Sequence, residues 1–104
     1  EAVDTAVGRI IAALEKVGGR ALITADHGNA EEMLAFAKDG ASEPCTKHSI
    51  NPVPCILFDP TYEGGYQLRQ PQGDFTPGLS HLAATLFEVM GFDVPEDLNP
   101  SLIE

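Results

Sequence analysis

The feature that most constrains this chain is a short apolar run that leads directly into a polar turn containing glycine. The run Ala21-Leu22-Ile23 is followed by Thr24, Ala25, Asp26, His27 and Gly28. A continuous apolar run predicts a buried strand, here over residues 20–25, in a parallel sheet that is covered on both faces. Ligands of open α/β sheets bind beyond the strand ends, so Asp26 and His27 lie where a site is expected.

Helices are predicted near both ends of the chain. Residues 1–17 carry apolar side chains at steps of three and four, which predicts an amphipathic helix that Gly18-Gly19 ends. Gly8 inside this helix is interpreted as a close packing contact. Thr76-Pro77 predicts the start of a last helix that ends at Gly91. Its expected buried stripe consists of Leu79, Leu82, Leu86 and either Val89 or Met90.

The segments between these helices are shorter and more varied. Residues 29–38 are compatible with a short helix, and residues 39–47 read as a polar loop. Cys55–Phe58 predicts a second buried strand, and residues 66–68 predict a short edge strand. The final apolar pair, Leu102-Ile103, is expected to dock on the body of the protein.

This order of elements is typical of an α/β fold with a mostly parallel sheet flanked by helices. The 104 residues are enough for one small domain, and 43% of them are apolar. The chain opens at Glu1, already inside a helical pattern and without a methionine. We therefore expect residues 1–104 to be a segment of a longer protein.

The composition argues against several classes of partner. The net charge is −10, from 6 basic and 16 acidic residues, which disfavours nucleic acid and anionic membrane surfaces. No apolar run approaches the length of a membrane span. Two cysteines are too few for a disulfide framework, which favours a reduced, cytoplasmic location.

Asp26, His27 and His48 are the candidate metal ligands. His48 lies in a loop before the second strand, and the two strands, if they are neighbours, would bring the three residues to one edge of the sheet. Carboxylate oxygen and imidazole nitrogen together suit zinc, manganese or iron. The alternative is a surface histidine in a loop and an aspartate that caps a helix.

The remaining reactive side chains have ordinary interpretations. His81 is read as a packing or solvent-facing histidine, and Cys45 and Cys55 as one loop thiol and one core thiol. Arg69 could meet an anionic ligand, although a lone loop arginine is usually solvated. The chain has no glycine-rich phosphate loop, no nucleophile elbow and no serine in a nucleophilic setting. It therefore has possible metal ligands without a complete catalytic apparatus.

Two separated motifs give the chain a family resemblance. The stretches Thr24–Glu31 and His48–Pro54 closely resemble the cofactor-independent phosphoglycerate mutases of the alkaline phosphatase superfamily. Residues 1–10 resemble the helix that precedes the first motif in that family, and residues 78–91 resemble its last helix. The resemblance therefore covers nearly the whole chain in the correct order.

The resemblance implies an isomerase that interconverts 3-phosphoglycerate and 2-phosphoglycerate in glycolysis. Such enzymes work through a phosphoserine intermediate and two divalent metals, usually Mn²⁺, with Mg²⁺ or Co²⁺ as further possibilities. Asp26 and His27 match the pair that binds the metal beside the nucleophilic serine. His48 matches a ligand of the other metal.

The resemblance also implies what this chain lacks. The nucleophilic serine, the other metal ligands and the substrate-binding arginines would lie outside it, so it has no catalytic residue of its own. We expect the C-terminal segment of an alkaline-phosphatase-like three-layer sandwich, inactive alone and a weak metal binder. The parent is expected to be monomeric, whereas unpaired strand edges would open the fragment to self-association. Ser49, His81 and Ala84 depart from the family pattern and leave the subgroup open.

Two other functions stay open. Phosphopentomutase, a phosphosugar mutase of the same superfamily, also has an Asp-His-Gly strand end and a later histidine. Asn29-Ala30-Glu31 and residues 51–54 favour the phosphoglycerate enzyme over it. The third possibility is a non-catalytic acidic module in which the histidines are incidental.

Overall fold

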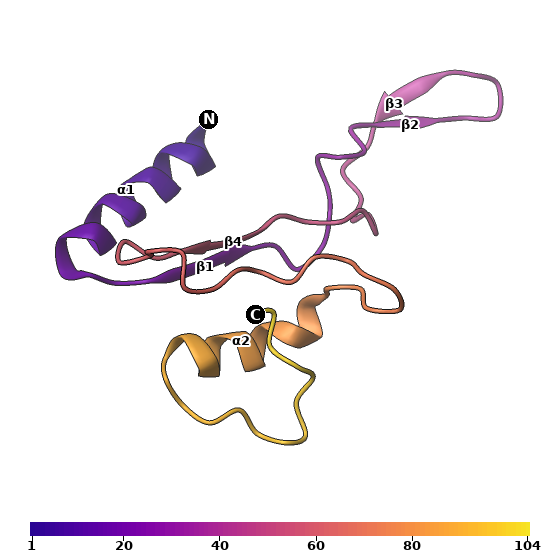
Figure 1. Cartoon of the computed structure of the whole chain (residues 1–104). Coiled ribbons are helices and arrows are strands. Elements are labelled where there is room, and N and C mark those ends of the chain that lie inside the picture. The colour runs from indigo at the N-terminus through magenta and orange to yellow at the C-terminus, as the bar shows by residue number, and fades with distance from the viewer. The chain divides into compact units, whose positions relative to one another are not determined.

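The computed structural model describes all residues, 1–104, as two compact units: Glu1–Pro60 and Thr61–Glu104 (Figure 1). The first unit contains α1 (Ala2–Val17), β1 (Ala21–Thr24), β2 (Leu34–Phe36), β3 (Ser42–Pro44) and β4 (Cys55–Phe58). The second contains the 3-10 turn η1 (Leu79–His81) and α2 (Leu82–Val89). No helix here combines the length and the apolar character needed to span a membrane.

Helix α1 confirms the first predicted element. It ends where Gly18 adopts a left-handed conformation with φ 64°, and the Gly19 N–H donates to the Leu14 carbonyl at 2.9 Å. Its apolar stripe is largely uncovered within the chain, because Val3 and Val17 are each 77% exposed. Open space surrounds Gly8, so the interpretation of this glycine as a packing contact is wrong.

The two predicted strands, β1 and β4, pair with each other from Ala21↔Phe58 to Thr24↔Cys55. The expected parallel arrangement is wrong, because this pair is antiparallel, as is the pair of β2 and β3. A parallel neighbour requires a crossover that returns the chain to the starting end of the sheet. Here no helix lies between β1 and β4, and the chain returns to β4 after the short hairpin of β2 and β3.

The hairpin of β2 and β3 replaces the short helix predicted for residues 29–38. Its pairing runs from Leu34↔Pro44 to Phe36↔Ser42. The Gly40 N–H closes the turn by donating to the Ala37 carbonyl at 2.9 Å, and Gly40 itself has φ 85°. A positive φ strongly favours glycine, so this position determines where the chain reverses.

The last helix begins later than the sequence predicts. Gly78, rather than Thr76, is the residue before the first turn, and α2 ends at Val89, just before Gly91. The expected buried stripe is also wrong, because Leu79 and Leu86 are 46% and 43% exposed. Ala84 and Thr85 are the buried residues of α2.

The C-terminal segment docks as predicted. The N–H groups of Gln67 and Glu104 donate to each other's carbonyls at 2.8 and 2.9 Å, and Leu68 forms an antiparallel bridge with Ile103. Leu102 is only 4% exposed, and its N–H donates to the Thr85 hydroxyl at 2.9 Å. The core of the second unit therefore lies between α2 and this terminal segment.

Candidate metal centre

The polar turn after β1 lies beside the segment that leads into β4. Gly28 and Ser49 form an antiparallel bridge, with N–H to carbonyl distances of 3.2 and 2.8 Å. Gly28 is buried there, and a Cβ at this position would collide with the Ser49 hydroxyl and lie 3.0 Å from Glu31 Oε2. The glycine of the Asp-His-Gly motif therefore permits a close approach of the two segments.

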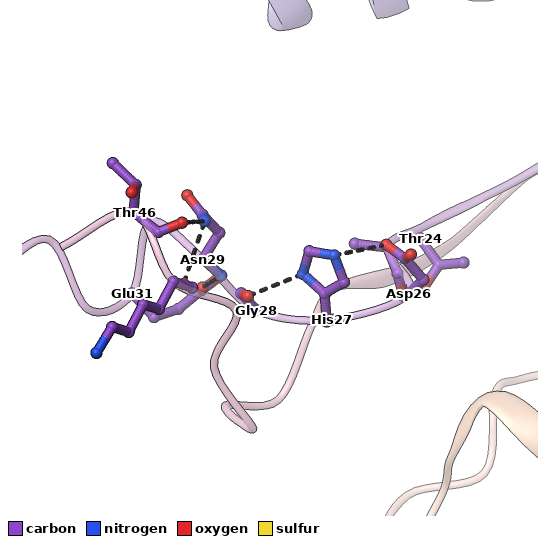
Figure 2. Close-up of polar contacts among 9 residues, drawn as sticks. Thr24, Asp26, His27, Gly28, Asn29, Glu31 and Thr46 are labelled. Atoms are coloured by element: carbon purple, nitrogen blue, oxygen red, sulfur yellow. Dashed lines mark hydrogen bonds and ion pairs between the residues drawn. The ribbon is translucent and has the colours of Figure 1, made fainter.

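The His27 ring is oriented by the backbone beside it. Its Nδ1 lies 3.0 Å from the Gly28 carbonyl oxygen (Figure 2). A carbonyl only accepts, so this contact suits the imidazole tautomer that has its proton on Nδ1 and its lone pair on Nε2. Nε2 lies 3.6 Å from Asp26 Oδ1. The Asp26 side chain is 87% exposed and that of His27 is 35% exposed, so both side chains are in contact with solvent.

His48 is brought to the same place. The rings of His27 and His48 stack with their centroids 3.6 Å apart and their planes inclined by 16°. The sequence prediction that these histidines meet beside the sheet is therefore matched by the structure. The predicted reason was wrong, since a parallel sheet would have placed the end of β1 and the start of β4 at opposite edges.

The side chains of this chain supply two metal-ligand atoms close together rather than a complete coordination sphere. No group of three or more histidine, cysteine, aspartate or glutamate side chains is arranged to hold a metal in this chain. Asp26 Oδ1 and His27 Nε2 nevertheless fit a shared ion, because two ligands about 2.1 Å from a tetrahedral metal lie about 3.4 Å apart. Their chemistry, one carboxylate oxygen and one imidazole nitrogen, suits a divalent cation.

The acids and thiols nearby have other roles. Glu31 Oε2 accepts the Asn29 N–H at 2.7 Å, and hydrogen bonds from the Glu31 and Asn29 N–H groups hold the pKa of the Glu31 carboxyl below its ordinary value. Cys45 and Cys55 are free thiols, and burial raises the pKa of Cys55. A raised pKa makes the Cys55 thiolate, the form that binds metals, less available at neutral pH.

His81 and Arg69 lie in the second unit. His81 Nδ1 lies 2.8 Å from the Pro100 carbonyl, and its ring meets Phe75 edge to face at 5.2 Å. This packing matches the ordinary interpretation of His81. The guanidinium carbon of Arg69 lies 6.0 Å from the Phe75 ring centroid, and its buried Nε has no hydrogen-bond partner.

Sequence reasoning missed the side chains that connect the two motif segments. The Asn29 side chain donates to the Thr46 carbonyl in the other segment. The Asn51 side chain donates to Glu32 in the other segment and to the Ser49 hydroxyl in its own. An amide beside each candidate ligand segment was the only available signal. It does not identify a partner, because asparagine bonds to any nearby carbonyl or carboxylate.

Comparison with known proteins identifies a family for this chain. Residues 1–94 match the model of the metalloenzyme superfamily. The chain belongs to the metalloenzyme superfamily. This membership agrees with a carboxylate–imidazole pair that fits a divalent ion.

The relatives of this metalloenzyme chain are described as phosphoglycerate mutases. It is 42% identical over 112 residues to the probable 2,3-bisphosphoglycerate-independent phosphoglycerate mutase 2 of Arabidopsis thaliana, covering 100% of the chain and 20% of the relative. Identity to the corresponding mutase 2 of Methanosarcina acetivorans is 48% over 98 residues, with coverages of 94% and 17%. The predicted resemblance to these mutases is therefore confirmed.

A solved structure supports the fold of the metalloenzyme chain. A crystal structure of Leishmania mexicana phosphoglycerate mutase at low cobalt concentration matches it with TM-score 0.84 and 33% identity. The match covers 100% of this chain and 20% of the other. The chain thus spans about a fifth of the length of these relatives, and the expected alkaline-phosphatase-like α/β class is confirmed.

Proposed function

We propose that this chain supplies metal ligands to the active site of a phosphoglycerate mutase that interconverts 3-phosphoglycerate and 2-phosphoglycerate. The observation that carries the proposal is the 3.6 Å separation between Asp26 Oδ1 and His27 Nε2, which suits two ligands of one divalent ion. The mutase descriptions of the relatives supply the substrate class.

We assign Asp26 and His27 to one Mn²⁺ and His48 to a second. Nitrogen lone pairs lie in the plane of an imidazole, so the stacked rings of His27 and His48 direct them within two nearly parallel planes. This favours neighbouring ions over one shared ion. Bound divalent ions would stabilise charge on a phosphoryl group during transfer and activate the nucleophile.

The chain acts in this proposal as part of a longer cytoplasmic protein. The exposed apolar stripe of α1 supports a covering surface supplied by other residues of such a protein, because amphipathic helices normally bury that face. The free thiols of Cys45 and Cys55 support the reducing location. The nucleophilic serine and the remaining ligands would come from outside residues 1–104.

The test is a chimera in which residues 1–104 replace the equivalent segment of the Arabidopsis thaliana relative. The expected result is conversion of 3-phosphoglycerate to 2-phosphoglycerate, with both activity and bound Mn²⁺ reduced by Asp26→Ala and His48→Ala. His81→Asn, in the second unit, is the matched histidine control and should leave both unchanged. Full Mn²⁺ content and activity in the Asp26 and His48 variants would contradict the proposal. The pentomutase alternative is tested on the full-length protein that contains this segment, because the substrate contacts lie outside residues 1–104; turnover of ribose 1-phosphate by that protein would favour it.

A further inference from the structure

The side chain of Asn29 reaches from the Asp26-His27 turn to the backbone just before His48. Its Nδ2 donates to the carbonyl oxygen of Thr46 at 3.2 Å (Figure 2). The same Nδ2 lies 3.2 Å from the carbonyl oxygen of Lys47. Its own N–H donates to Glu31 Oε2 at 2.7 Å, which holds the turn from the other side. One amide thus connects the segment of His27 to the residue that immediately precedes His48.

Asn51 makes the reciprocal connection from the second segment. Its Nδ2 donates to Glu32 Oε1 at 2.7 Å, and it lies 3.1 Å from the Ser49 hydroxyl. Glu32 belongs to the segment that follows His27. The Asn29 bonds run from this segment to the one around His48, and the Asn51 bond runs back from the second segment to the first. The Gly28–Ser49 backbone bridge joins the same two segments.

These contacts fix the backbone of His48 on both sides. The Lys47 carbonyl accepts from Asn29, and both backbone polar groups of Ser49 pair with Gly28. Asn29 and Glu32 are exposed, so each side-chain bond competes with water and contributes little by itself to overall stability. Their common effect is on geometry, because His48 has little freedom to move away from His27.

We infer that Asn29 and Asn51 are positioning residues that hold the His48 ring against the His27 ring. This inference deepens the proposed function, on which its relevance to metal binding rests. It concerns the arrangement of the two rings before any ion binds. Loss of the side-chain amide of either Asn29 or Asn51 should let the His48 segment separate from the Asp26-His27 turn, while β1 and β4 stay paired.

The experiment is NMR spectroscopy of the metal-free 104-residue chain. Wild type should show a direct contact between the aromatic protons of His27 and His48, and Asn29→Ala and Asn51→Ala should weaken it severalfold. Gln70→Ala is the matched control, since Gln70 Nε2 also donates to a carbonyl, that of Leu68, at 3.0 Å in the other unit. Backbone contacts between Leu22 and Leu57 report separately on the β1–β4 pair.

Asn29→Asp separates hydrogen bonding from side-chain volume, because aspartate has the same shape without the N–H donors. It should weaken the ring contact as Asn29→Ala does. A ring contact of wild-type strength in Asn29→Asp or in both alanine variants would overturn the inference. If the β1–β4 contacts vanished together with the ring contact in every variant, the amides would be general stabilising groups, and the inference would be wrong.

The metal is tested separately, by titrating the chimera with Mn²⁺. Removing an outer group that orients a ligand typically weakens metal binding about 10-fold to 100-fold, and Asn29→Ala should do so here. Absence of any Mn²⁺ binding by the unsubstituted chimera would defeat the proposed function. In that case, the ring contact in the metal-free chain would still decide whether Asn29 and Asn51 position the histidines.

Discussion

The imidazole rings of His27 and His48 stack face to face, with centroids 3.6 Å apart, although they belong to segments on opposite sides of a hairpin. The contact exists because β1 and β4 are antiparallel, so the end of one strand lies beside the start of the other. Two kinds of contact connect the segments that carry the two histidines. They are the Gly28–Ser49 backbone bridge and the side-chain hydrogen bonds of Asn29 and Asn51, and Glu31 accepts the backbone N–H of Asn29. The antiparallel pairing of β1 and β4 therefore places two of the proposed metal ligands, His27 and His48, side by side.

The 104-residue chain should not convert 3-phosphoglycerate when supplied with Mn²⁺. Asp26 and His27 offer two donors to one ion, and catalytic metal sites usually need three protein ligands. No serine of the chain has a recognisable nucleophilic setting. The measurement is a coupled assay for 2-phosphoglycerate, with a full-length relative as the positive control. Robust turnover by the purified chain would show that the site is complete within it.

Gly28→Ala should destabilise the first unit by about 1–3 kcal/mol, the usual range for forcing atoms into a well-packed site. The new Cβ would collide with the Ser49 hydroxyl and crowd Asn51 Cβ at 3.3 Å. Urea unfolding gives the free energy, and the His27–His48 NMR contact should weaken in parallel. Gly65→Ala is the control, because a Cβ there would meet no atom within 4 Å and should change stability little. Equal effects of the two substitutions would refute a specific role for Gly28.

Stability should depend on the ionisation of Glu31. Hydrogen bonds from the Glu31 and Asn29 N–H groups lower the pKa of this carboxyl in the folded state. A lowered pKa means that the stabilisation is present above the ordinary glutamate pKa and is lost as the pH falls through the lowered value. Glu31→Gln should therefore reduce the free energy of unfolding at pH 7, with the difference from wild type shrinking toward pH 3.

Thermal or urea unfolding at several pH values measures this difference. Glu63→Gln removes an exposed carboxylate from the second unit and serves as the charge-matched control. The Glu31 effect should exceed that of the control at neutral pH. A difference between wild type and Glu31→Gln that stayed constant from pH 7 to pH 3 would rule out this ionisation effect.

Gly8→Ala should stabilise α1 by roughly 1 kcal/mol, the difference in helix propensity between the two residues. The position is exposed, and a Cβ there meets no atom within 4 Å. Amide hydrogen exchange along α1 is the suitable measurement, because it reports the local helix. Ala6→Gly, at another exposed position of α1, should accelerate exchange by a comparable factor. Unchanged or faster exchange in Gly8→Ala would contradict the prediction.

Local patterns predicted the elements that depend on neighbouring residues. The apolar spacing and Gly18 identified α1 and its end, and Cys55–Phe58 was predicted with the bounds that β4 has. The hairpin of β2 and β3 was missed, although Asp39-Gly40 is a recognised turn signal. Met33, Leu34 and Ala37 have helical spacing, and this short pattern outweighed the turn residues in the prediction.

Sequence patterns were enough to select the candidate metal ligands Asp26, His27 and His48, because each follows or precedes a strand. The antiparallel direction of β4, the stacking of His27 on His48 and the hydrogen bonds of Asn29 and Asn51 are visible only in the folded chain. This division arises because apolar periodicity reflects local conformation and burial. Strand direction and amide partners depend on the return path of the chain, which brings distant residues together through hydrogen bonds that no local pattern encodes.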